Sequence, residues 1–121
     1  MFPNLYFLAE EVRVELIELM DLMLETNEQQ FVTQVSPICT MLGKVVADSN
    51  PDMKSKSATF SGKIALTLGK KIGQFMGSPV ESLMANLTHQ HSKVRRTTLK
   101  GLRDVMCCKG AEQYLGENAL L

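Results

Sequence analysis

With 121 residues, the chain is long enough for one ordinary domain and too short for two. Apolar residues make up 45% of it and charged residues 21%, which excludes a disordered chain and indicates a soluble globular one. The formal net charge is zero, but residues 1–52 carry nine acidic and two basic side chains, whereas residues 53–121 carry four acidic and eleven basic ones.

Apolar residues recur at helical spacing along the whole chain, and no segment alternates as a strand would. In chain order, the pattern predicts helices over residues 4–9, 10–25, 28–47, 51–73, 79–89, 92–108 and 111–121. We expect Asn27, Asn50 and Ser78 to cap the helices that follow them. Gly73, Gly77 and Gly110 are expected to end helices. The fold class is therefore all-α.

The helices repeat as a pair. Apolar–basic pairs open three helices at Val12-Arg13, Met53-Lys54 and Val94-Arg95, and each pair follows the previous one at the same 41-residue offset. A two-helix unit of this length buries its apolar face only by stacking on a neighbour. We therefore predict one α-solenoid segment of antiparallel helix pairs, about three repeats of period 41. Its repeats span roughly 1–25, 28–73 and 78–108, and a further one starts at 111–121.

The period, the two-helix unit and an internal proline, Pro37, which is expected to kink the helix over 28–47, resemble the HEAT-repeat family. The clearest stretch is HSKVRRTTLKGLRDV at 91–105, a turn followed by a helix that opens with Val-Arg. Residues 81–95 and 50–69 are similar to repeats of factors that assemble axonemal dynein arms for cilia. The resemblance implies a non-enzymatic cytoplasmic scaffold whose partners are axonemal dynein chains and assembly chaperones.

Basic side chains gather on the second helix of each predicted pair, which we call the B helix, the first being the A helix. The residues that we select for partner binding are Arg96, Lys100, Arg103, Lys56 and Lys63. A solvated basic face is the other interpretation. For Lys54, Lys56 and Lys63 we favour pairing with acidic residues of the first B helix, namely Glu11, Glu15, Glu18, Asp21 and Glu25.

The basic residues at the B-helix starts, Arg13, Lys54 and Arg95, are expected to form a ladder between repeats. Each would bond to carbonyls or acids of a neighbouring repeat, for example Arg95 to Asp52. A general HEAT adaptor, or a nucleic-acid-associated HEAT module that uses the basic C-terminal half, is an alternative function. The absence of Trp and an aromatic content of 6% disfavour the nucleic-acid-associated module, because bases stack on aromatic side chains.

Nothing in the sequence indicates a cofactor or an enzyme. His89 and His91 are interpreted as a solvated turn in which one histidine helps to cap a helix. Three cysteines indicate a reducing, cytosolic setting, and we expect one of Cys107 and Cys108 to be buried and the other part-exposed. No run reaches the roughly 18 apolar residues of a membrane helix. Neither end carries the polar cap of a solenoid, which predicts an interior slice of a longer array that is marginally stable or self-associates through its ends.

Overall fold

The computed structural model describes residues 9–108, and every regular element in this range is helical. The α-helices are α1 (Glu10–Thr26), α2 (Glu28–Thr33), α3 (Val35–Val46), α4 (Pro51–Leu68), α5 (Gly77–Ala85) and α6 (Ser92–Met106). Short 3-10 helices follow α4 at η2 (Gly69–Lys71) and η3 (Gly73–Phe75), and follow α5 at η4 (Asn86–Thr88). The all-α prediction is confirmed. The helices predicted over 4–9 and 111–121 lie outside the described residues, apart from position 9.

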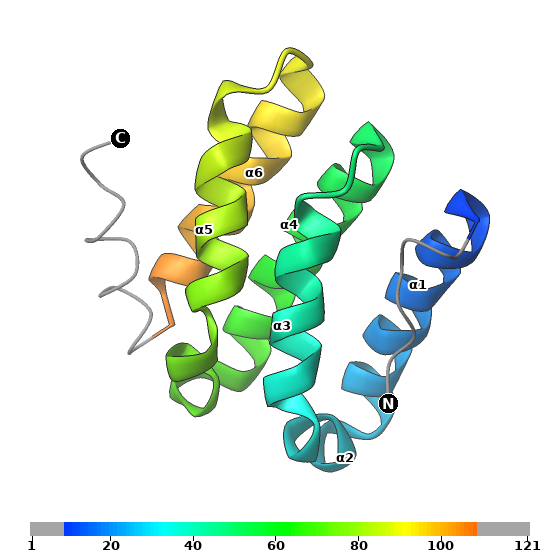
Figure 1. The fold of residues 1–121 in the computed structure, drawn as a ribbon. Helices are drawn as coiled ribbons and strands as arrows, with labels where there is room; N and C mark the ends of the chain where they lie inside the picture. The colour runs from blue at the N-terminus through cyan, green and yellow to red at the C-terminus, as the bar shows by residue number, and fades with distance from the viewer. Residues whose placement is uncertain (1–8, 109–121) are drawn as a thin grey trace.

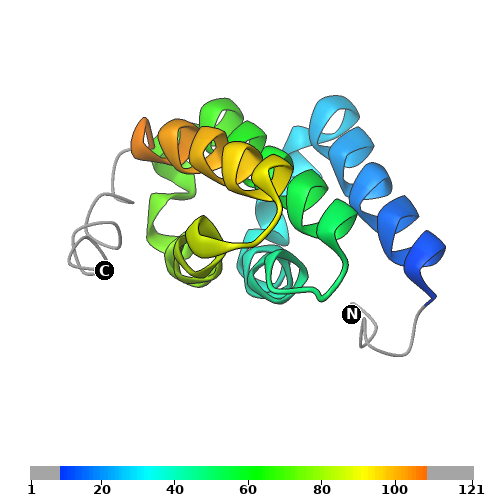
Figure 2. The ribbon, with the colours of Figure 1, turned by 90° about the horizontal axis from the view of Figure 1, so that it is seen from above.

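The helices stack in two layers (Figures 1 and 2). The B helices α1, α4 and α6 lie side by side in one layer, and the A helices α3 and α5 form the other. Short connections join α3 to α4 and α5 to α6, so each pair runs antiparallel (Figure 1). This arrangement is the α-solenoid that the repeat predicted.

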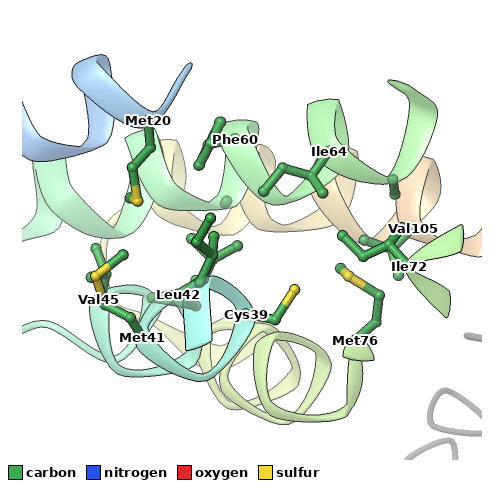
Figure 3. Close-up of a cluster of buried hydrophobic side chains, with 14 of the residues drawn as sticks. Met20, Cys39, Met41, Leu42, Val45, Phe60, Ile64, Ile72, Met76 and Val105 are labelled. Atoms are coloured by element: carbon green, nitrogen blue, oxygen red, sulfur yellow. The ribbon is translucent and has the colours of Figure 1, made fainter. Parts of the chain in front are cut away.

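The core lies between the two layers. Met20, Phe60 and Ile64 of the B layer point toward Leu42 and Cys39 of α3 (Figure 3). Residues that the 41-residue offset relates are both buried at Val35/Met76, Cys39/Val80, Leu42/Leu83, Met53/Val94 and Ile64/Val105. The offset therefore relates positions that contribute to the same layer of core.

The helix predicted over 28–47 is interrupted, and the break lies at Gln34 rather than at Pro37. Gln34 leaves the helical conformation with φ −110° and ψ 14°, so α2 ends at Thr33 and α3 begins at Val35. Pro37 lacks a backbone N–H to donate to the carbonyl of Thr33, and its ring crowds that carbonyl. The distortion therefore falls one turn before the proline.

Gly73 and Gly77 do not end helices as predicted: Gly73 begins η3, and Gly110 lies outside the described residues. Gly69, with φ +56°, ends α4 five residues before the predicted end, because glycine accepts this left-handed conformation without a steric cost. Gly77 begins α5 instead of ending a helix, which places Ser78 inside the first turn, without a side-chain cap. The caps at Asn27 and Asn50 are confirmed, since the Asn50 side chain accepts from the backbone N–H groups of Asp52 and Met53.

Candidate protein-binding face

The B helices form one face of the stack, and a groove of about 370 Å³ crosses it. Its lining comes from α1, α4 and α6, and consists of Ile17, Glu18, Asp21, Asp52, Ser55, Lys56, Thr59, Phe60, Lys63, Lys93 and Thr97. Ile17 and Phe60 are buried, whereas the charged side chains are part or fully exposed. The groove therefore combines apolar residues with three acidic and three basic side chains.

Lys56 and Lys63 bridge α4 to α1. Lys56 Nζ lies 3.3 Å from a carboxylate oxygen of Glu18. Lys63 Nζ lies 2.6 Å from a carboxylate oxygen of Asp21 and also pairs with Glu25. Hydrogen bonds to Asp21 and then to Glu25 raise the pKa of Lys63 above its usual value. Both lysines therefore form ion pairs with acidic residues of α1, and a ligand in the groove would meet them as paired groups.

Arg96, Lys100 and Arg103 form an exposed row on α6, which we call the basic row. The Arg103 guanidinium lies 3.2 Å from the adjacent Asp104 carboxylate, and its side chain is 71% exposed. Within residues 9–108, no ion pair joins Arg96 or Lys100 to another side chain. The basic row does not line the groove, so the structure separates the five selected residues into a paired set on α4 and an open set on α6.

The three residues of the predicted ladder each bond to a connection between an A helix and the B helix that follows it, which we call a corner. The group that accepts the bond differs from one residue to the next. The Arg13 guanidinium makes a two-point contact with the Asp48 carboxylate at 2.8 and 3.1 Å, and both side chains are largely buried. Lys54 Nζ donates to the Asn86 side-chain oxygen at 3.2 Å, and burial lowers the pKa of Lys54. Arg13 and Lys54 therefore each reach the following repeat.

Arg95 turns back on its own repeat. Its guanidinium donates to the backbone carbonyls of His89 and Gln90 at 2.6 and 3.0 Å. The expected contact between Arg95 and Asp52 does not form, because Lys93 approaches Asp52 instead, at 3.8 Å. Arg95 thus holds the turn that leads into α6.

The sequence interpretation missed Asp48 and Asn86 as partners of the ladder. Asp48 is buried and also accepts from the backbone N–H of Asn50, so one carboxylate joins the first B helix to the corner before the second. Asn86 is buried and donates to the Val46 carbonyl at 2.8 Å. Their position in the corners before the B helices was the available signal, since buried polar groups in corners must find bonding partners.

The remaining polar groups have structural roles. His89 Nδ1 accepts from the backbone N–H of His91, the residue before α6, and burial, followed by nearby positive charge, lowers the pKa of His89. Burial raises the pKa of Cys39 to about 12. Cys108 is buried and Cys107 is exposed, as predicted. Among residues 9–108, no group of three or more His, Cys, Asp or Glu residues is placed to hold a metal ion.

None of the helices between residues 9 and 108 has both the length and the apolar character that crossing a membrane requires.

Comparison with known proteins gives two matches. A family model described as "Dynein axonemal assembly factor 5-like, TPR repeats" matches residues 4–117. Dynein axonemal assembly factor 5 of Xenopus laevis is 27% identical over 88 residues, which are 73% of this chain and 10% of that protein. The chain therefore spans about a tenth of this relative. No solved structure matches.

Proposed function

Because the chain belongs to the family of dynein axonemal assembly factor 5-like proteins with TPR repeats, we propose that it is a non-enzymatic helical-repeat scaffold that acts in cytoplasmic preassembly of axonemal dynein arms. The extent of the family match, residues 4–117, carries this proposal. Since the chain covers about a tenth of the frog relative, the proposal concerns what this repeat segment contributes to such a protein.

The basic row supports a contact with an acidic segment of a partner protein. Arg96 and Lys100 extend from α6 without an ion pair within residues 9–108, so their charge is available to a ligand. Opposite charge steers an approaching partner and selects against others. The neighbouring groove offers the buried side chains of Ile17 and Phe60 for an apolar anchor. Axonemal dynein chains and assembly chaperones are the partners that we propose.

We also propose that the repeats are of the HEAT type, with units at 1–25, 28–73 and 78–108 and a further unit from 111. Two features support this. The first long A helix is broken at Gln34, one turn before Pro37, and Arg13, Lys54 and Arg95 hold equivalent positions at the starts of B helices. In this arrangement the B helices carry the binding face, so partner contact depends on α6 and not on the A layer.

The experiment is capture of interactors with the tagged chain from nuclease-treated cytosol of ciliating cells. One variant carries Arg96→Glu, Lys100→Glu and Arg103→Glu. The control variant carries Lys44→Glu, Lys70→Glu and Lys71→Glu, three exposed lysines outside the B helices that give the same change in net charge. We expect mass spectrometry to identify axonemal dynein chains or assembly chaperones with the natural chain and the control, and not with the α6 variant.

Three other results would contradict the proposal. Binding that appears only when nuclease is omitted would favour the nucleic-acid alternative, and its strong weakening by salt would support that alternative. Recovery of unrelated proteins through the same basic row would indicate a general adaptor. Retention of dynein chains by the α6 variant would place the contact away from α6.

A further inference from the structure

Both ends of the B layer expose apolar side chains at positions that are buried inside the stack. On α1, Leu19 is 62% exposed, whereas Phe60, its equivalent on α4 by the repeat offset, is 4% exposed. On α6, Leu99 is 57% exposed, whereas its α4 equivalent Ala58 is fully buried. Val12 on α1 and Met106 on α6 are also exposed, and their α4 equivalents Met53 and Ala65 are buried. We call these two surfaces the α1 face and the α6 face.

The α6 face and the α1 face are equivalent, by the repeat offset, to the two surfaces that meet where α4 packs on α6. Gly101 of α6 packs against the backbone of α4 at Ala58, so positions 58 and 101 meet. One repeat offset relates Ala58 to Leu99 on the α6 face, and two offsets relate Gly101 to Leu19 on the α1 face. A second copy placed by the repeat geometry therefore brings its Leu19 onto Leu99 of the first.

The charges at this contact are complementary. Within the stack, Glu18 of α1 pairs with Lys56 of α4. Two repeat offsets relate Lys100 to Glu18, and one offset relates Glu15 to Lys56. A contact between an α6 face and an α1 face thus pairs Lys100 with Glu15 of the second copy, with the two signs exchanged. Like charges at this position would oppose the contact, and opposite charges favour it.

We propose that this chain binds a second copy of itself head to tail, with the α6 face of one copy packed on the α1 face of the next. Leu99 of one copy then covers Leu19 of the next, as Ala58 and Gly101 meet between α4 and α6. Such a contact joins two different surfaces, so it leaves one of each face open at the ends of a dimer and extends to longer species.

Sedimentation velocity of the whole 121-residue chain over a range of concentrations tests the proposal. Leu19→Glu closes the α1 face, and Leu99→Glu closes the α6 face. We expect each variant alone to self-associate at least about tenfold more weakly, because a charge replaces a leucine that the contact between copies would bury. Mixed in equal amounts, the two variants retain one usable face each, and they should form one-to-one dimers and no longer species.

Leu66→Glu is the matched control, because Leu66 is 58% exposed on α4, inside the stack rather than at its end. It should associate like the natural chain, and far-UV circular dichroism should show all three variants folded. A natural chain that stays monomeric up to about 1 mM would overturn the proposal. So would Leu19→Glu that associates fully by itself, since that result indicates a contact between two α6 faces. Failure of the mixed variants to pair would also overturn it.

Discussion

The contact between α4 and α6 and the contact between α1 and α4 join successive B helices by different physics. At α4–α6, small residues let the backbones meet: a Cβ added to Gly101 would lie 2.6 Å from the Ala58 carbonyl oxygen. At α1–α4, the residue at the glycine position is Phe60, and charged side chains span the helices from Lys56 and Lys63 to the acids of α1. The first contact depends on close backbone packing, whereas the second adds exposed ion pairs to the packing of larger side chains.

This difference shows which part of the stack is open to adjustment. Close backbone packing leaves no room for rearrangement, because interiors are packed to near-crystal density. Exposed ion pairs contribute less and respond to salt. We therefore expect α1 to separate from α4 before α6 does.

Gly101→Val should produce the largest loss of stability. The added side chain has no space against the α4 backbone, so the two helices must move apart and lose their buried contacts. We expect a loss of about 3 kcal/mol in the free energy of unfolding, measured by urea denaturation.

Gly62→Ala is the control for Gly101, because its added methyl group meets the Asp104 side chain, which can move, rather than backbone. We expect a loss of about 1 kcal/mol or less, partly offset by the better helix propensity of alanine. Equal losses for the two variants would show that contact with backbone rather than with a side chain is not the special feature of Gly101.

Arg13→Met should cost about 2 kcal/mol, because it leaves the buried Asp48 carboxylate without its cation. The figure lies below that for a fully buried pair because the Arg13 side chain keeps 15% of its exposure. Chemical denaturation measures the loss, and a double-mutant cycle with Asp48→Asn isolates the pair. Additive losses in that cycle would mean that Arg13 acts through packing and not through Asp48.

Lys63→Ala should have the smallest effect and should act on one end of the stack. We expect a slightly lower Tm at low salt that returns to that of the natural chain in about 1 M NaCl, where charges are screened within about 3 Å. In hydrogen exchange, amides of α1 should become less protected and those of α6 should not. Lys70→Ala, at an exposed lysine of η2, is the control. Faster exchange in α6 would contradict the comparison.

The ion pairs of Lys63 with Asp21 and Glu25 also make the stability of the chain depend on pH. Because Asp21 and Glu25 raise the pKa of Lys63 in the folded state, its contribution is complete below the usual lysine pKa of 10.5. That contribution is lost as the pH rises through the raised value. Alkaline titration above 10.5 should therefore reduce the difference in stability between the natural chain and Lys63→Ala.

The sequence alone determined the helical class, the two-helix unit and the starts of the B helices. These properties depend on local patterns in the chain: apolar spacing of helical period, the Asn50-Pro51 cap, and the apolar–basic pair that recurs at the 41-residue offset. The exposure of Arg96, Lys100 and Arg103 also followed from helical spacing, because their spacing places them on one face of a single helix.

Only the tertiary structure decided which side chains meet. The pairing of Lys56 and Lys63 with acidic residues of the first B helix was expected and is present, whereas Arg95 bonds to its own turn rather than to Asp52. The close approach at Gly101 was likewise not visible in the sequence. The physical reason is that helical periodicity sets the direction of a side chain, whereas the distance between two helices is set by the residues packed between them.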